Sequence, residues 1–285
     1  MPKIGFIGAG TVGTALAVRL KERGYAVIAV ASRSRSSADK LAASVPGCQP
    51  YDKKQAVADI AELVFITTPD DAIAQVASEL KWHKGQSVVH CSGAHSLDIL
   101  EPVTRAGAQA GAFHPLQTFA NVAHAIKNIP GSAFALEANG ELLQTLKNMA
   151  QDLDGTWVKL GAGDKVLYHA AAVFACNYLV TLMKMATDLW QTFGVSTPEA
   201  TRALLPLLRG TLNNLENIGL PNCLTGPIAR GDLGTINRHL KALEQSAPAL
   251  LHTYRDLGLQ TIPIALSKGK IDSKRAEEMR QLLTS

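Results

Sequence analysis

The sequence predicts an α/β protein in which a doubly wound, mostly parallel sheet is followed by an all-helical domain. From residue 3 to about residue 160, short apolar segments alternate with helical patterns, which is typical of a sheet covered by helices on both faces. After Gly161 the strand pattern stops, and apolar residues recur at three-to-four spacing. The 285 residues are enough for about two domains, which we place at residues 1–160 and 161–285.

Seven segments have the length and composition of strands, and each is bounded by turn residues or by a helical pattern. They are residues 3–7, 26–31, 63–67, 87–90, 111–113, 133–136 and 156–160. In a parallel sheet of this kind, ligands bind at the carboxyl ends of the strands. The residues that directly follow each segment are therefore the first candidates for a functional site.

The helical part begins near residue 164. Its first pattern is apolar almost all round through Met185, which predicts the central, buried helix of the second domain. The longest apolar run, residues 170–183, is interrupted by Asn177 and is shorter than the ~20 residues of a membrane span. Further along, Thr197-Pro198-Glu199 predicts a helix start with Thr197 as the N-cap.

Composition argues against several classes of function. The chain is 47% hydrophobic and 18% charged with a net charge of +4, and it has no basic run of the kind that binds nucleic acid. Its four cysteines lie far apart without a C-x-x-C pair, so neither a zinc site nor a disulfide framework is indicated. Strand-like sequence begins at Lys3, which leaves no room for a signal peptide. We expect a cytoplasmic protein without metal, nucleic-acid or membrane partners.

A glycine motif directly follows the first predicted strand. Gly8-Ala9-Gly10-Thr11-Val12-Gly13 has the spacing G-x-G-x-x-G between a strand and a helix. The first glycine permits a tight turn, the second lets a pyrophosphate approach the backbone, and the third allows the helix to pack closely on the strand. Free amide groups and the helix dipole then meet the phosphate charge. The motif predicts a dinucleotide-binding turn, the alternative being a turn that merely packs tightly.

The loop after the second predicted strand is rich in basic and hydroxyl side chains. An NAD-specific site usually carries an acid there for the ribose 2'-hydroxyl. Here the strand is followed by Ser32-Arg33-Ser34, and no acid occurs between Gly24 and Asp39. Guanidinium and hydroxyl groups suit a 2'-phosphate. We therefore predict NADP(H) as the cofactor, the alternative being a solvated basic loop.

Polar residues also follow three other predicted strands. Thr68 and Pro69 would pass under the adenosine ribose and the phosphates, or would form a turn that only caps the next helix. Ser92 would lie beside the nicotinamide, and His114 and Gln117 would lie near the substrate. A lone histidine is more often structural than catalytic, but His90 and His114 stand at adjacent strand ends.

The first helix of the second domain carries polar groups whose burial would be costly without partners. Lys165 and His169 are one turn apart and share a face, whereas Asn177 lies two turns further and about 80° round the helix. Reduction of a C=O or C=N bond by hydride needs a proton donor, which Lys165 or His169 can supply. The alternative is that Lys165 caps a solvated first turn, while His169 and Asn177 stabilise helix packing.

These motifs resemble the Rossmann-like oxidoreductases of the 6-phosphogluconate dehydrogenase superfamily whose C-terminal domain is a helical domain of unknown function. Besides the glycine turn, the resemblance is carried by His90-x-Ser92-Gly93, His114-Pro-Leu-Gln-Thr-Phe119, Tyr168-His169-Ala-Ala-Ala with Asn177, and Thr225-Gly-Pro227-x-x-Arg230-Gly-Asp232. More distant relatives include β-hydroxyacid dehydrogenases, ketopantoate reductases and pyrroline-5-carboxylate reductases. In the first two, an interdomain helix offers a catalytic Lys and, one turn later, an Asn; Lys165 matches the former, but His169 replaces the latter. The resemblance also implies a homodimer.

The expected function is hydride transfer between NADPH and a small carbonyl substrate, such as a keto acid, in a cleft between the domains. Lys165 or His169 would donate the proton, and Asn177, Gln117 and His114 would orient the group that receives hydride. Tyr168 and Arg230 would contact the substrate; Arg230 could clamp a carboxylate, pair with Asp232 or make a dimer contact. The alternatives are an imine reductase of the pyrroline-carboxylate type, a deazaflavin-linked reductase, or a non-catalytic protein that senses NADP(H) or acts as a scaffold.

Overall fold

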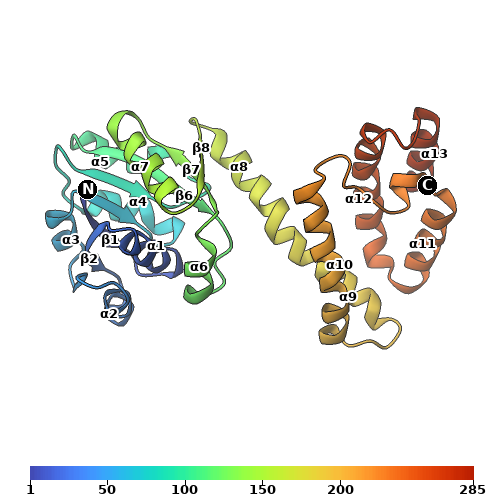
Figure 1. Cartoon of the computed structure of the whole chain (residues 1–285), viewed down its shortest axis with the longest axis horizontal. Helices are drawn as coiled ribbons and strands as arrows, with labels where there is room; N and C mark the ends of the chain where they lie inside the picture. The colour runs from blue at the N-terminus through green and yellow to red at the C-terminus, as the bar shows by residue number, and fades with distance from the viewer. The chain divides into compact units, whose positions relative to one another are not determined.

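The computed structural model describes all 285 residues, which form two compact units, Met1–Asn177 and Tyr178–Ser285 (Figure 1). The first unit contains one eight-stranded sheet in the order β3-β2-β1-β4-β5-β6-β7-β8. Every neighbouring pair is parallel except β6 and β7. The strands are β1 Lys3–Ile7, β2 Ala26–Ala31, β3 Gln49–Tyr51, β4 Leu63–Ile66, β5 Ser87–His90, β6 Gln109–Leu116, β7 Ala133–Glu137 and β8 Thr156–Lys159. The predicted doubly wound sheet is confirmed.

Two strands differ from the sequence-based expectation. Strand β3 was not predicted because it is only three residues long, contains Pro50 and lies at the edge of the sheet. Strand β6 is longer than expected and includes His114, since its antiparallel pairing with β7 continues to Leu116 opposite Ala133. His114 therefore projects from a strand and not from the loop after it.

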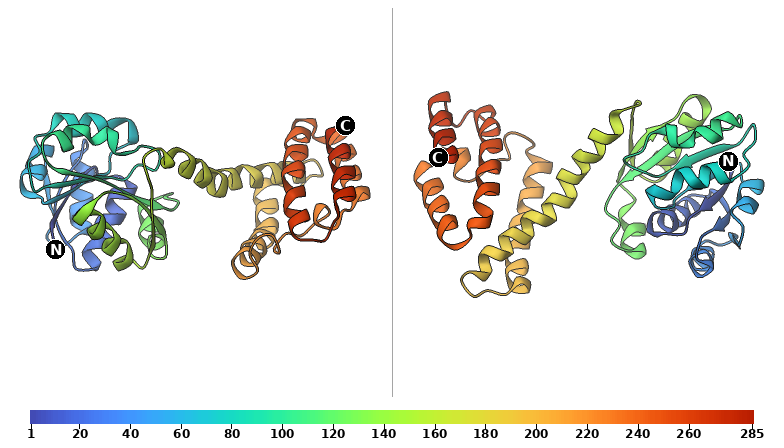
Figure 2. Two further views of the ribbon diagram at one scale, coloured as in Figure 1. Left: turned by 90° about the horizontal axis from the view of Figure 1, so that it is seen from above. Right: turned by 180° about the vertical axis from the view of Figure 1, so that it is seen from behind.

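Helices cover both faces of the sheet (Figure 2). Apolar side chains of α1, α2, α6 and α7 pack on one face, and those of α3, α4 and α5 pack on the other. On the first face, Phe6 stacks on Phe65 and Phe113 stacks on Phe134, with ring centroids 5.2 and 4.6 Å apart. The helices are α1 Thr11–Glu22, α2 Arg35–Ser44, α3 Lys54–Ile60, α4 Asp70–Glu79, η1 Leu97–Leu100, α5 Glu101–Arg105, α6 Val122–Asn128, α7 Gly140–Asp152 and α8 Asp164–Ala172.

The first unit extends beyond the expected boundary at residue 160 and includes α8. Two long-range hydrogen bonds explain this: Lys165 and Tyr168, both on α8, bond to the Ser92 carbonyl and to His114 of the sheet. A π-helical turn, Val173–Asn177, then links α8 to α9, so that residues 164–191 form one continuous helix.

The second unit is all-helical, as predicted. It consists of α9 Tyr178–Gln191, α10 Thr197–Asn217, η3 Ile228–Arg230, α11 Leu233–Ser246, α12 Pro248–Ser267 and α13 Ser273–Thr284. Its core is formed mainly by α11, α12 and α13, which bury Ile236, Ile262, Ala276 and Met279. This part of the chain therefore has a hydrophobic core of its own.

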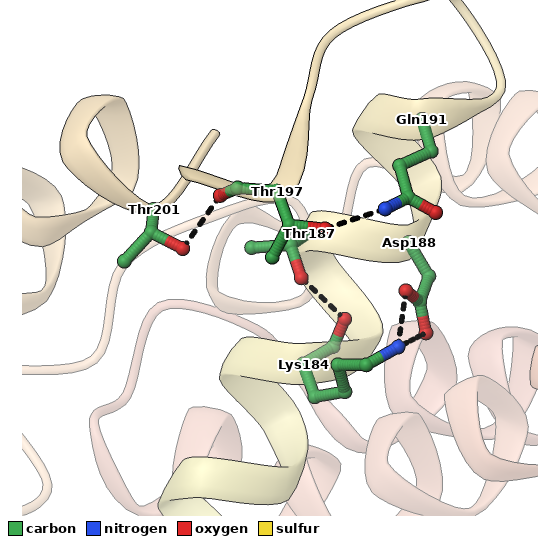
Figure 3. A network of polar contacts seen from close by, with 6 residues as sticks. All are labelled: Lys184, Thr187, Asp188, Gln191, Thr197 and Thr201. Carbon is green, nitrogen blue, oxygen red and sulfur yellow. Dashed lines mark hydrogen bonds and ion pairs between the residues drawn. The ribbon is translucent and has the colours of Figure 1, made fainter. Parts of the chain in front are cut away.

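Polar contacts stabilise the turn between α9 and α10 (Figure 3). Gln191 donates to the Thr197 hydroxyl, and the Thr201 hydroxyl donates to the Thr197 carbonyl at 2.7 Å. The N-cap of α10 is Ser196, one residue before the predicted Thr197. Glu199 accounts for the difference, because its carboxylate accepts hydrogen bonds from the Ser196 amide and hydroxyl, as in a capping box.

The helix over residues 164–191 is not buried as predicted. Only Lys165 and Thr187 on it are buried, whereas apolar side chains such as Val166, Leu167 and Val180 are exposed. Apolar residues at helical spacing predict a helix surface that is shielded from water. They do not show whether residues of the same chain shield it. With an 18-residue window of mean hydropathy 1.6, the helix is long and apolar enough to cross a membrane, by length and composition only.

Candidate functional site

The glycine turn joins β1 to α1 at the carboxyl edge of the sheet. Gly8 has a φ of +112°, and a Cβ there would lie 2.6 Å from the Thr67 carbonyl group. A Cβ on Gly13 would lie 2.4 Å from Thr67 Oγ1, which itself donates to the Gly8 carbonyl at 2.8 Å. Both glycines are therefore required by packing against Thr67.

Gly10 differs from the other two glycines because a Cβ there would meet no atom within 4 Å. It is the N-cap of α1, and the first turn of that helix has neither a side-chain cap nor an acid. The open space and the uncapped amide groups fit an anionic group at this helix terminus. The cradle thus fits the pyrophosphate of a dinucleotide.

The loop after β2 contains one cationic side chain that has no ion-pair partner within the chain. Arg33 is exposed and makes no ion pair within the chain, whereas the neighbouring Arg35 bonds to Asp39 and Asp52. Ser34 is the N-cap of α2 and accepts from the Ser37 amide at 3.3 Å. Arg33 is therefore the group in this loop that can meet a phosphate without breaking another contact.

The loop after β4 leads into a helix and extends the site. Pro69 is the N-cap of α4, so the expected role of this turn in starting the helix is realised. The next residue, Asp70, accepts a hydrogen bond of 2.7 Å from the Ser92 hydroxyl. Thr68 has a buried hydroxyl without a hydrogen-bond partner. The loops after β4 and β5 are therefore tied together at this edge of the sheet.

Ser92 organises the loop after β5. It is buried, and its hydroxyl accepts from the amides of Ala94 and His95 at 3.2 and 3.1 Å while donating to Asp70. The Ser92 amide donates to His90 Nδ1 at 3.1 Å. Because its side chain is fully engaged, Ser92 shapes the backbone of the loop, and any cofactor contact here comes from that backbone.

Four predicted site residues meet around this loop. Lys165 Nζ donates to the Ser92 carbonyl at 2.9 Å, and the lysine side chain is fully buried. Tyr168 Oη lies 2.8 Å from His114 Nδ1. A Cβ on Gly93 would lie 2.8 Å from both the His114 and His169 rings, so only glycine lets the two rings approach the loop this closely. The shared face predicted for Lys165 and His169 is thus realised.

Burial sets the protonation states in this cluster. It lowers the pKa of Lys165 to about 8, and the charge of Glu137 partly opposes that change. Burial, reinforced by the Lys165 charge, lowers the pKa of His114 to about 4. Burial also raises the pKa of Tyr168 to about 12. At neutral pH the cluster therefore combines a charged ammonium with a neutral imidazole and a neutral phenol.

Two predicted residues lie outside the cluster. Gln117 donates to the Asn128 carbonyl at 3.2 Å and accepts from the Thr118 amide, so it organises its own loop. Asn177 is exposed, and the π-helical turn at 173–177 changes its angular position from the value expected for a regular α-helix.

Arg230 belongs to the second unit, where it lines a hollow of about 420 Å³ together with Thr225, Lys268 and Lys270. Asp232 and Arg230 do not form an ion pair. Instead, Asp232 is the N-cap of α11 and accepts from the Thr235 amide at 3.0 Å. Of the roles open to Arg230, the ion pair with Asp232 is therefore not realised.

Residues 2–115 match the family model of a Rossmann-like domain, and residues 132–261 match that of a domain of unknown function, DUF2520. A candidate NADP oxidoreductase from Bacteroides fragilis has 25% identity and a TM-score of 0.71, over 92% of this chain and 98% of its own. A protein from Thermotoga maritima has 26% identity and a TM-score of 0.76, and the match covers 93% of this chain and 99% of that protein. A reductive aminase from Aspergillus terreus, solved with NADPH and ethyl levulinate, shares the fold at 18% identity and a TM-score of 0.67. The match covers 100% of this chain and 99% of the aminase. A comparison with curated proteins gives no match.

Proposed function

For a chain that pairs a Rossmann-like domain over residues 2–115 with the domain of unknown function DUF2520 over residues 132–261, we propose NADP-dependent reduction of a small carbonyl compound, such as a keto acid. One observation carries the proposal: a buried, charged Lys165 stands among neutral His114 and Tyr168 at the sheet edge that holds the glycine turn. The similarity to a candidate NADP oxidoreductase from Bacteroides fragilis supports it.

The cofactor in this proposal is NADP(H), which supplies hydride when it is bound. The backbone of residues 8–13 holds the pyrophosphate, and Ser32, Arg33 and Ser34 hold the 2'-phosphate. Thr68 and Pro69, after β4, pass under the adenosine ribose and the phosphates, and the backbone near Ser92, after β5, lies beside the nicotinamide.

Lys165 is the proton donor in this proposal. With a pKa of about 8, its ammonium is charged at neutral pH and holds a proton that a developing alkoxide can take. His114 and Tyr168, both neutral at neutral pH, orient the oxygen together with His169. A charged ammonium stabilises an alkoxide but repels the cationic iminium form of an imine, which is why we favour a carbonyl substrate. Gln117 and Asn177 have no part in proton transfer here.

The experiment that tests this function is NADPH oxidation across 2-keto acids, 3-keto acids and cyclic imines, with identification of the products. Turnover of a keto acid to an alcohol supports the proposal. Turnover of imines alone, with amine products, contradicts the substrate class. Tight NADPH binding without turnover on any compound favours a sensor or scaffold, and hydride transfer to a deazaflavin favours that class of reductase.

Replacement of Arg33 by alanine is expected to raise the Kd of NADPH about tenfold or more and to leave the Kd of NADH unchanged. A hydrogen bond to a charged group contributes about 1.5–3 kcal/mol, and Arg33 has no other partner. Arg35→Ala is the matched control, because Arg35 already bonds to Asp39 and Asp52. Calorimetric titration of both nucleotides measures these dissociation constants. An NADPH affinity of Arg33→Ala equal to that of the wild type would contradict binding of the 2'-phosphate by this loop.

We also propose that the protein is a cytoplasmic homodimer in which a second copy covers the exposed apolar face of α9 and α10. Leu182, Leu204 and Leu207 line a hollow on this face, where Leu207 is 70% exposed. The nearby charges of Lys184 and Asp188 neutralise each other in an ion pair (Figure 3). An apolar face without unpaired charge suits a self-complementary contact with an identical chain.

Replacement of Leu207 by glutamate is therefore expected to convert a dimer into a monomer, because each copy would bury an unpaired charge in the interface. Light scattering coupled to size exclusion measures the mass directly. Leu257→Glu, which places the same charge on an exposed position of α12, should leave the dimer intact. A wild-type chain that is monomeric, or that is recovered only with lipid or detergent, would contradict the proposal.

A further inference from the structure

Two buried polar side chains, of His90 and Glu137, lie in one row across the sheet. In the register of the sheet, His90 of β5 lies opposite Ala112 of β6, and Ala112 lies opposite Glu137 of β7. Residues paired in this way project from the same face of a sheet. Ala112 has the smallest side chain of the three, so an imidazole and a carboxylate stand on either side of a methyl group. All three residues are buried.

The carboxylate of Glu137 is only partly satisfied by hydrogen bonds. The Leu97 backbone bonds to the carboxyl group, but Oε2 is buried and has no hydrogen-bond partner. Burying an ionised carboxylate without a partner or an opposite charge costs several kcal/mol. A compensating cation is therefore expected nearby.

Lys165 is the cation whose charge acts on both His90 and Glu137. It is fully buried, and its Nζ is anchored on the carbonyl of Ser92, two residues beyond His90. Glu137 is the stronger of the two carboxylates that act on Lys165, the other being Asp70, while the buried Cys91 thiol is neutral. Asp98 of η1 and Asp164 at the start of α8 also face Glu137, and both carry the same sign as Glu137. Lys165 is thus the only cation among the charges that act on this carboxylate.

We propose that Glu137 is a positioning residue for Lys165: its carboxylate is the buried counter-charge that keeps the Lys165 ammonium protonated and anchored on the Ser92 carbonyl. The carboxylate offsets the cost of burying the ammonium, and the ammonium offsets the cost of burying the carboxylate. The role of Glu137 follows from the burial of these two opposite charges and does not depend on which substrate the protein reduces.

Titration of the Lys165 side chain by NMR in lysine-labelled protein tests the proposal without a substrate. The Lys165 signal is assigned by its loss in Lys165→Met. In the wild type it should titrate near its pKa of about 8, and in Glu137→Gln at a pH lower by about one unit or more, since Glu137 is the first of the charges that raise the lysine pKa. Glu137→Asp, which keeps the charge, should restore most of the wild-type value.

Glu141→Gln is the matched control, because it removes an exposed carboxylate four residues away on the first turn of α7 and should leave Lys165 unchanged. A titration of Lys165 that is the same in Glu137→Gln as in the wild type would overturn the proposal. If Glu137→Gln does not fold, Glu137→Asp decides: a small downward shift of the Lys165 titration supports the proposal, because the shorter side chain moves the charge, and a titration equal to or above that of the wild type overturns it. Failure of all substrates in the turnover panel would leave this measurement unaffected, so the two proposals fail separately.

Discussion

Replacement of Gly10 by alanine is expected to raise the Kd of NADPH at least tenfold while the thermal stability stays the same or rises. Gly10 has φ −80°, which any residue adopts, and an added Cβ would meet no protein atom within 4 Å. Gly→Ala at a compatible position stabilises by about 0.4–1 kcal/mol through the unfolded chain. The space that the methyl group would fill is where a pyrophosphate approaches the backbone, so the penalty should fall on binding alone.

Substitutions at two other glycines are the controls that distinguish an effect on binding from an effect on folding. Gly13→Ala should lower the Tm as well as the affinity, because its Cβ would lie 2.4 Å from Thr67 Oγ1 and 2.7 Å from the Gly8 carbonyl oxygen. Gly210→Ala on α10 also enters open space, and it should change neither the affinity nor the fold. Differential scanning fluorimetry and calorimetric titration measure the two quantities. Wild-type affinity in Gly10→Ala would show that the dinucleotide does not bind along this turn.

Replacement of Lys165 by methionine is expected to lower kcat by a factor of about 10² to 10⁴, the usual contribution of a positioned general acid. The KM should change much less, since the proton is transferred only in the transition state. In the wild type kcat should fall as the pH rises above about 8, because the lysine then loses the proton that it donates. The residual activity of Lys165→Met should lack this alkaline decline.

Lys184→Met is the matched control for this variant, since Lys184 is exposed and pairs only with Asp188. It should leave both kcat and its pH profile unchanged. The rates are measured with the substrate found in the panel. Undiminished turnover in Lys165→Met would exclude it as the proton donor and would direct attention to His169.

The same lysine links folding stability to pH. Its pKa in the folded chain, about 8, lies below the ordinary value of 10.5, so the unfolded chain binds more protons between these pH values. The free energy of unfolding of the wild type, relative to that of Lys165→Met, should therefore rise with pH from about 8 to 10.5, by up to about 3 kcal/mol. Urea unfolding of the two proteins at several pH values measures this difference.

Local features were predictable from the sequence because they depend on neighbours along the chain. The glycine turn needs only a strand, three spaced glycines and a helix, and the structure has each of them at the expected residues. The break at Gly161 between strand patterns and helical patterns likewise follows from a change of period from two to 3.6. Lys165 and His169 share a face because one turn of helix separates them, and no tertiary contact is needed to know this.

Other features depended on pairings between distant residues, which no local pattern encodes. Strand β6 includes His114 only because β7 continues to pair with it, and α8 joins the first unit because Lys165 reaches Ser92, 73 residues earlier. The role of Glu137 could not be predicted from the sequence, because a single acid at the end of an apolar strand is equally typical of a strand end that is exposed to solvent.

The sequence by itself thus determined the fold class, the dinucleotide turn and the helix that carries the polar residues, because periodicity and glycine geometry act over a few residues. Only the tertiary structure decided which of those polar residues meet, how deeply they are buried and therefore which of them hold a proton at neutral pH. Burial and nearby charges are properties of the folded surroundings: the ordinary pKa of a lysine is 10.5, and burial at the Ser92 carbonyl lowers the pKa of Lys165 to about 8, against the opposing effect of the Glu137 charge.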